Sequence, residues 1–187
     1  MPPKARITRD MIIEAGVKIV RTEGADSLNV RRVAAMLECS TQPVMYHFKI
    51  VNDLKNAVYE AANNLHTEYI MQPDIDAENP FMSIGLRYIQ FAKDETYLFR
   101  FLFQSNKFQN VGLMDIMNAD DLLPIIAPLC ETTNIPETQV RTVFETMFIC
   151  VHGIASLIAN NAITYDKEHF KKMLVMLFDG IIAKLGG

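Results

Sequence analysis

The apolar residues of this chain recur at helical spacing along most of its 187 residues. One predicted helix covers residues 8–23 and carries its apolar face on Ile12, Ala15, Ile19 and Val20. Another covers residues 52–70 and carries that face on Leu54, Val58, Ala61, Leu65 and Tyr69. The sequence has no internal repeat and no alternation of apolar and polar residues of the kind typical of a half-buried strand. We therefore predict an all-α fold.

The pattern of residues 29–49 predicts two short helices joined by a tight turn. Asn29 is a favourable N-cap for the first of them. The apolar face of this helix comprises Val30, Val33, Ala34 and Leu37. Ser40 offers a second N-cap a few residues later, and Pro43 falls in the first turn after it, where a missing N–H costs nothing. This spacing is typical of a helix-turn-helix.

The second short helix carries polar and aromatic side chains where a core-facing helix would carry aliphatic ones. Its projecting residues are Thr41, Gln42, Tyr46, His47 and Lys49. Side chains of these types donate hydrogen bonds to DNA phosphates, and the Gln42 amide can pair with two atoms of adenine in the major groove. A solvated helical hairpin in an all-α domain fits the same pattern. Periodicity alone leaves both interpretations open.

Residues 8–55 resemble the N-terminal DNA-binding domain of the TetR family of one-component transcriptional repressors. The match to the first two helices of that domain runs through TRDMIIEAGVKIVRTEGADSLNVRRVAAMLECS and includes Gly24, which ends the first helix. The segment VMYHFKIVNDL resembles the recognition helix and the entry to the fourth helix. The resemblance implies a DNA-binding head, for which we expect contacts from Asn29, Arg31, Ser40, Thr41, Gln42, Pro43, Met45, Tyr46, His47 and Lys49.

Three positions depart from the family pattern. Glu38 stands where a Gly normally ends the second helix, so a left-handed turn there would cost about 1 kcal/mol or give way to another turn geometry. Met45 occupies the usual place of the recognition-helix Tyr, with Tyr46 one position later, and Val51 stands where a phosphate-binding Lys is common. These departures concern individual contacts with DNA.

The formal net charge of −4 is unevenly distributed along the chain. Residues 1–55 hold nine Lys and Arg against six Asp and Glu, which gives +3, and Lys4, Arg6 and Arg9 of that set lie in the first nine residues. Residues 71–187 hold nine basic residues against fourteen acidic ones, which gives −5. An acidic protein with a locally basic head is compatible with binding DNA.

The sequence gives little support for catalysis. None of the four histidines has a Cys, Ser or acidic partner at the spacing of a known metal site or nucleophile motif, and there is no Gly-rich phosphate loop. His152 lies among apolar neighbours and is expected to be a buried, hydrogen-bonded helix residue, whereas a small helical enzyme would need a titratable cluster around it. We expect no enzymatic activity, no metal and no cofactor.

Three cysteines, at positions 39, 130 and 150, are too far apart in sequence for a metal knuckle. Reduced thiols in a cytoplasmic protein are the default interpretation, and a redox-sensing thiol is the alternative. No apolar run reaches the ~18 residues needed to span a bilayer. We expect a soluble, cytoplasmic protein without a membrane partner.

The segment QPDIDAENP, residues 72–80, interrupts the helical pattern with two prolines and three acidic residues. We place a domain boundary there, with a helix-turn-helix domain over residues 1–52, a connecting helix over 52–70, and a helical ligand-binding and dimerisation domain over 71–187. The apolar residues after the boundary either fill a thick core or line a cavity. The candidate ligand-binding residues are Tyr88, Phe91, Phe101, Met114, Met117, Met147 and His152.

Two helices predicted near the C-terminus carry apolar surfaces too wide for burial on one side. The residues expected to mediate dimerisation are Phe144, Val151, Ile154, Ile158, Leu174, Leu177, Phe178 and Ile181. A four-helix bundle between two chains would bury these surfaces, and so would a monomer in which both helices are central.

The function that these patterns and the family resemblance favour is a homodimeric, ligand-responsive transcriptional repressor. It would bind a pseudo-palindromic double-stranded DNA operator and be released by an apolar or amphipathic small-molecule effector. The alternative is a DNA-independent helical dimer that binds a ligand or a partner protein, and the departures at Glu38, Met45 and Val51 favour it.

Overall fold

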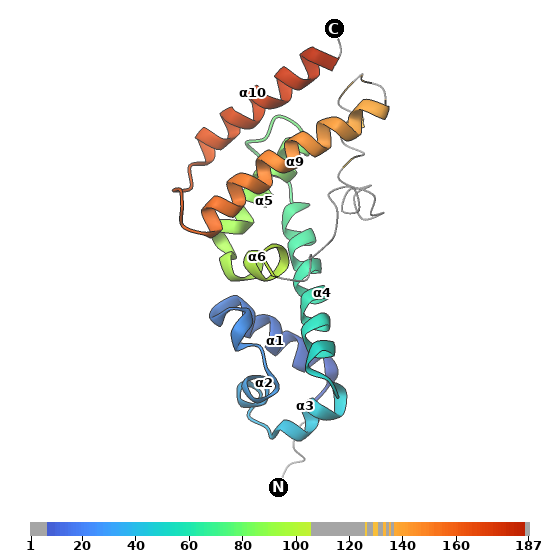
Figure 1. The fold of residues 1–187 in the computed structure, drawn as a ribbon, viewed down its shortest axis with the longest axis vertical. Coiled ribbons are helices and arrows are strands. Elements are labelled where there is room, and N and C mark those ends of the chain that lie inside the picture. Colours follow the sequence, from blue (N-terminus) through green and yellow to red (C-terminus); the bar gives the residue numbers. More distant parts are fainter. Residues whose placement is uncertain are drawn as a thin grey trace. The chain divides into compact units, whose positions relative to one another are not determined.

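In a computed structural model, the described residues are 7–105, 126, 129–130, 133, 135 and 137–185, and this part of the chain contains helices and no strand (Figure 1). The all-α prediction is therefore confirmed. The elements are α1 (Arg9–Glu23), the 3-10 helix η1 (Ala25–Ser27), α2 (Val30–Met36), α3 (Thr41–His47), α4 (Val51–Ile70), α5 (Pro80–Asp94), α6 (Thr96–Phe103), α9 (Glu137–Ala159) and α10 (Lys167–Leu185).

The chain forms two compact units. The N-terminal unit comprises Met1–His66 and Glu95–Ser105, and the C-terminal unit comprises Thr67–Asp94 and Asn106–Gly187. Helix α4 therefore begins in the first unit and ends in the second. Helix α6 belongs to the N-terminal unit, although it follows α5 of the C-terminal unit in sequence.

The core of the N-terminal unit is built on the apolar face of α1. Its fully or nearly fully buried residues include Ile12, Ile19, Val20, Leu28, Val33, Val44, Leu54 and Val58. Gly16 permits close approach of α1 and α4, because a Cβ atom there would collide with the side chain of Val58. This core fixes the backs of α2 and α3 and leaves their outer faces exposed.

Helix α6 is attached to the N-terminal unit through polar and aromatic contacts. Arg21 Nε of α1 lies 2.9 Å from an oxygen of Glu95, the residue before α6, and the Tyr59 hydroxyl of α4 donates to the Leu102 carbonyl at 3.3 Å. His66 packs edge-on against Phe103 with ring centroids 5.0 Å apart, and burial lowers the pKa of His66 to about 4. The imidazole of His66 is therefore neutral at physiological pH.

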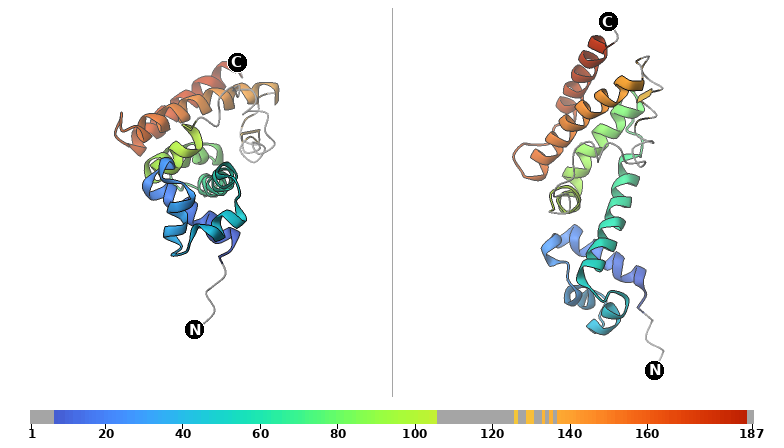
Figure 2. Two further views of the ribbon diagram at one scale, coloured as in Figure 1. Left: turned by 60° about the horizontal axis from the view of Figure 1, so that its bottom comes forward. Right: turned by 45° about the vertical axis from the view of Figure 1, so that its right-hand side comes forward.

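The C-terminal unit is organised around the packing of α5 against α9, with α10 lying against both (Figure 2). Gly85 of α5 faces both neighbouring helices, since a Cβ atom built there would be in ordinary van der Waals contact with Val151 at 3.4 Å and Leu174 at 3.8 Å. Buried side chains shared among the three helices include Phe81, Ile84, Val140, Phe144, Met147, Ile154, Phe170 and Leu174.

Two helices end in a left-handed residue other than glycine. After α2, Glu38 has φ 51°, its N–H donates to the Ala35 carbonyl at 3.2 Å, and the Cys39 N–H donates to the Ala34 carbonyl at 3.0 Å. This pair of bonds is the Schellman motif that usually has glycine at the left-handed position. Of the two turn geometries expected at Glu38, the chain adopts the left-handed one, and Asn161 (φ 55°) ends α9 in the same way.

Helix α9 meets the length and composition limits for a membrane span over Gln139–Ala159, with a mean hydropathy of 1.7. Arg141 and Glu145 lie within this helix, so it is not a continuous apolar run, and the expectation that no apolar run reaches about 18 residues is not contradicted. In the structure, 44% of the most apolar 18-residue stretch of this helix is buried, and α9 packs against α5 and α10. These properties are those of the central helix of a helical unit.

Candidate nucleic-acid interface

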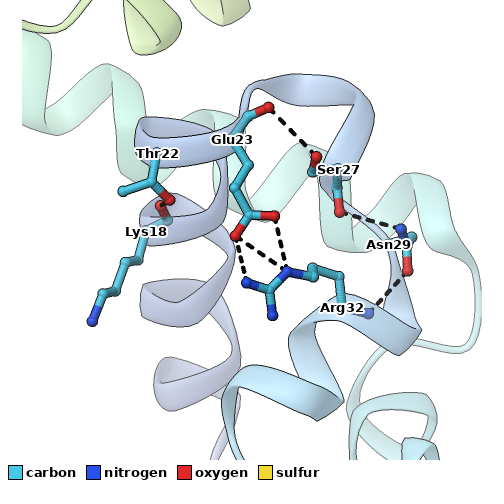
Figure 3. Close-up of polar contacts among 6 residues, drawn as sticks. All are labelled: Lys18, Thr22, Glu23, Ser27, Asn29 and Arg32. Carbon is cyan, nitrogen blue, oxygen red and sulfur yellow. Dashed lines mark hydrogen bonds and ion pairs between the residues drawn. The ribbon is translucent and has the colours of Figure 1, made fainter.

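Asn29 holds the start of α2. Its Oδ1 atom accepts a hydrogen bond from the Arg32 N–H at 3.0 Å, and its Nδ2 atom donates to the Ser27 carbonyl at 3.2 Å (Figure 3). The prediction that Asn29 is an N-cap is confirmed. Because both ends of its amide are bonded to the protein backbone, the role visible in the structure is to orient α2.

The adjacent arginines Arg31 and Arg32 differ in their contacts. Arg32 Nε donates to both carboxylate oxygens of Glu23, at 2.9 and 3.1 Å, and fastens α2 to the last turn of α1 (Figure 3). This hydrogen bonding lowers the pKa of Glu23 and raises that of Arg32. Arg31 is exposed and has no ion pair within the described residues. Arg31 is thus the cation of α2 that can reach a phosphate.

Helix α3 is anchored by one face and exposes the opposite one. Val44 is fully buried and Phe48, which follows the helix, is nearly so. On the other side, Met45 and Tyr46 lie three and four residues after Gln42, which places both beside it on the helix surface, and all three are exposed. Met45 is 53% exposed and Tyr46 is 74% exposed.

Ser40 occupies the N-cap position of α3 in an extended conformation, as predicted, but its hydroxyl makes no capping hydrogen bond. The hydroxyl lies on an exposed residue, while Thr41 and Pro43 are half-buried. The position of Ser40 therefore follows the sequence prediction, and its expected side-chain bond is absent.

His47 connects the end of α3 to the segment before α1. Its Nε2 atom lies 3.1 Å from the Ile7 carbonyl, to which the ring N–H donates, and its ring meets that of Tyr46 edge-on. Nearby, the Arg9 guanidinium lies over the Phe48 ring at 5.1 Å. His47 therefore has an internal partner, whereas the exposed Lys49 beyond it does not show one within the described residues.

Two exposed apolar residues next to α3 were not among the expected contacts. Ile50 is 60% exposed and Val51 is 42% exposed. The sequence analysis noted Val51 only because a phosphate-binding lysine is common at that position. It did not single out Ile50, because an apolar residue before an amphipathic helix is ordinarily assigned to the core.

In the C-terminal unit, the structure brings together two of the predicted ligand-binding residues. The Tyr88 hydroxyl lies 2.9 Å from His152 Nδ1, and burial lowers the pKa of His152. Phe148 stacks on His152 with centroids 5.6 Å apart, and Phe144 stacks on Phe148 at 6.0 Å. Phe148 was not predicted, although its spacing of four residues from both neighbours on α9 was a usable signal.

The other predicted ligand-binding residues are distributed differently. Phe91 and Met147 are buried in the C-terminal unit. Phe101 lies in the N-terminal unit, where its ring meets that of Tyr59 edge-on at 5.7 Å. Met114 and Met117 lie outside the described residues. Among the described residues, no group of three His, Cys, Asp or Glu side chains could hold a metal ion.

Comparison with solved structures gives full-length matches to one fold. The transcriptional regulator SCO7222, a TetR from Streptomyces coelicolor, is 16% identical and aligns over 96% of this chain and 99% of its own, with a TM-score of 0.65. The multidrug binding protein EbrR, solved with ethidium, is 19% identical with a TM-score of 0.56, over 95% and 99% of the two chains. BioQ from Mycobacterium smegmatis is 18% identical with a TM-score of 0.54 over the same shares.

This chain has the TetR fold. No protein-family model and no curated protein matches the sequence. The similarity to the TetR family that the sequence of residues 8–55 indicated thus extends, at the level of the fold, to nearly the whole chain.

Within this TetR fold, the residues predicted to mediate dimerisation are mostly used inside one subunit. Phe144, Val151, Ile154, Ile158 and Leu174 are buried in the protomer, and Leu177, Phe178 and Ile181 are partly exposed. The strongly exposed apolar side chains of the two helices are Ile149 and Leu157 on α9 and Met176 on α10. The residues predicted from their heptad-like spacing lie mostly on the inward faces of α9 and α10. Periodicity alone does not distinguish the two apolar faces of one helix.

Proposed function

We propose that this protein is a transcriptional regulator that binds DNA as a homodimer and presents the outer face of α3 to the major groove. The observation that carries this proposal is the exposure of Gln42, Met45 and Tyr46 on a short helix whose other face is anchored by Val44. The TetR fold supports it, and one protein of that fold is named a transcriptional regulator.

The dimer is required by the size of the reading element. Helix α3 spans Thr41–His47 and can reach only a few base pairs, whereas two copies related by a two-fold axis read two half-sites of a pseudo-palindrome. On α9, Ile149, Gly153 and Leu157 recur every four residues on an exposed face, and Met176 and Gly180 do so on α10. A Cβ atom at either glycine would meet nothing within 4 Å, so this face is open in the protomer. A second copy of the chain would cover it.

The effector is proposed to be an apolar or amphipathic molecule that contacts the cluster of Tyr88, Phe148 and His152 in the C-terminal unit. Aromatic rings and a neutral imidazole suit such a ligand. EbrR, of the same fold, is described as a multidrug binding protein and was solved with ethidium. Release from the operator requires that the ligand bind the DNA-incompetent state better by about 1–3 kcal/mol. Repression is the proposed outcome of operator binding.

The test is selection of bound fragments from a random duplex pool, followed by affinity measurements on the selected site. We expect a pseudo-palindrome, and a loss of at least tenfold in affinity for the double variant Gln42→Ala with Tyr46→Ala, because both side chains lie on the reading face. The matched control is Tyr97→Ala, since Tyr97 is an exposed tyrosine of the same unit on α6. Recovery of no enriched sequence, with an intact dimer, would favour the DNA-independent alternative.

A further inference from the structure

The exposed apolar side chains of the N-terminal unit are concentrated beside α3. Five large apolar residues of the described part of this unit are strongly exposed, and four of them lie within residues 45–51. They are Met45, Tyr46, Ile50 and Val51, while the fifth, Tyr97, lies on α6. A concentration of this kind on an otherwise polar surface is typical of a binding site.

The surroundings of this apolar group favour an anionic partner over an apolar protein surface. Helix α3 contains no carboxylate, and residues 29–50 hold Arg31, Arg32 and Lys49 against Glu38 alone, which gives +2 in a protein of net charge −4. Arg31 and Lys49 are both exposed and can contact phosphates.

In the major groove, only one group at the base edges is apolar: the C5-methyl group of thymine. Placing the Met45 thioether against a donor or acceptor of another base would leave that polar atom without water and without a hydrogen bond, which is unfavourable. Gln42 lies three residues earlier on the same face, about 4.5 Å along the helix axis, and the rise between base pairs is about 3.4 Å. The two side chains therefore address the same or neighbouring base pairs.

Resting on the proposed DNA-binding function, we propose that Met45 is a specificity-determining residue that reads a thymine methyl group, beside an A·T pair read by Gln42. The half-site then contains thymine at one defined position, and Met45 recognises that thymine through its methyl group alone. In this proposal Ile50 and Val51 extend the apolar contact toward the sugar-phosphate backbone. Val51 would make van der Waals contact there in place of the ionic contact of a phosphate-binding lysine.

The experiment replaces each thymine of the selected half-site by deoxyuridine, which removes the methyl group and leaves all hydrogen-bonding atoms in place. Binding of the full chain is measured by fluorescence anisotropy for the wild type and for Met45→Ala. We expect one position at which the uracil duplex binds the wild type about fourfold more weakly, the effect of one buried methyl group. At that position Met45→Ala should bind thymine and uracil duplexes equally.

Met71→Ala is the matched control, because Met71 is an exposed methionine of the C-terminal unit, and it should retain the full thymine preference. The proposal is overturned if no thymine position responds, or if Met45→Ala keeps the wild-type preference. It is also overturned if Met45→Ala changes the oligomeric state without DNA, because the apolar group is then a protein contact. Failure of the regulatory function itself is distinguishable, since the random pool then yields no enriched sequence to modify.

Discussion

At the scale of single residues, the turn after α2 places Glu38 in a left-handed conformation that its side chain disfavours. Glu38 adopts φ 51° because the Schellman bonds to Ala34 and Ala35 require a left-handed residue there. A side chain with a Cβ atom is strained in this conformation, and glycine is not. We expect Glu38→Gly to raise the free energy of unfolding by about 1 kcal/mol, measured by urea denaturation followed by circular dichroism.

Asn161 provides the comparison for this prediction, since it occupies the equivalent left-handed position after α9. Asparagine tolerates this conformation better than other residues with a Cβ atom, so Asn161→Ala should destabilise the protein, and Asn161→Gly should not. A lower stability of Glu38→Gly than of the wild type would contradict the strain argument.

At the scale of elements, the loop before α5 is fastened to the start of α10. Lys167 Nζ lies 2.9 Å from Asp74 Oδ1 and 2.7 Å from Asp76 Oδ2, and the Asp74 N–H donates to the Ser83 hydroxyl at 2.6 Å. Burial raises the pKa of Asp74, but the hydrogen bonds from Lys167 and from the Asp76 N–H, together with the positive charges of Lys167 and Arg87, lower it by more in total. The carboxylate is therefore easier to ionise in the folded chain than in the unfolded one.

This shift gives a pH dependence of known sign. Because the folded pKa of Asp74 lies below its unfolded value of about 4, the stabilisation is complete above that pH and disappears as the pH falls through the folded pKa. We expect Lys167→Met to lower the free energy of unfolding by about 1–2 kcal/mol at neutral pH and by less once the pH falls below the folded pKa of Asp74. Urea denaturation at neutral and at acidic pH measures the difference.

Lys172→Met is the control for the α10 prediction, because Lys172 is an exposed lysine of the same helix. It should have little effect at either pH. An equal loss at neutral and acidic pH for Lys167→Met would show that its methylene groups, and not its ion pairs, stabilise the loop.

At the scale of the whole molecule, the proposed function depends on the proposed pairing of two chains through the exposed face of α9 and α10. A carboxylate placed at Leu157 would be buried without a partner in the proposed dimer, at a cost of several kcal/mol. We expect Leu157→Glu to sediment as a monomer at micromolar concentration and to lose operator affinity by at least a hundredfold. Ile75→Glu is the control, since Ile75 is 97% exposed in the loop between α4 and α5. Unchanged sedimentation of Leu157→Glu would exclude this face as the interface.

The sequence alone determined the helical class, the limits of α1 and α4 to within one residue, and the N-cap at Asn29. These properties depend on residues within one or two turns of each other, because helix hydrogen bonds, caps and apolar periodicity are local. The local sequence also identified α3 as the candidate reading helix, since its polar residues lie where an aliphatic face would otherwise be.

Only the tertiary structure decided which side chains are available for binding. Arg32 and His47 have the chemistry of DNA contacts but bond to Glu23 and to the Ile7 carbonyl, while Arg31 and Met45 project from the surface. Likewise, the inward face of α9 was separated from its exposed face only by the packing of α5. A side chain becomes free or occupied through neighbours that are distant in sequence, and the spacing of residues along one helix carries no record of those neighbours.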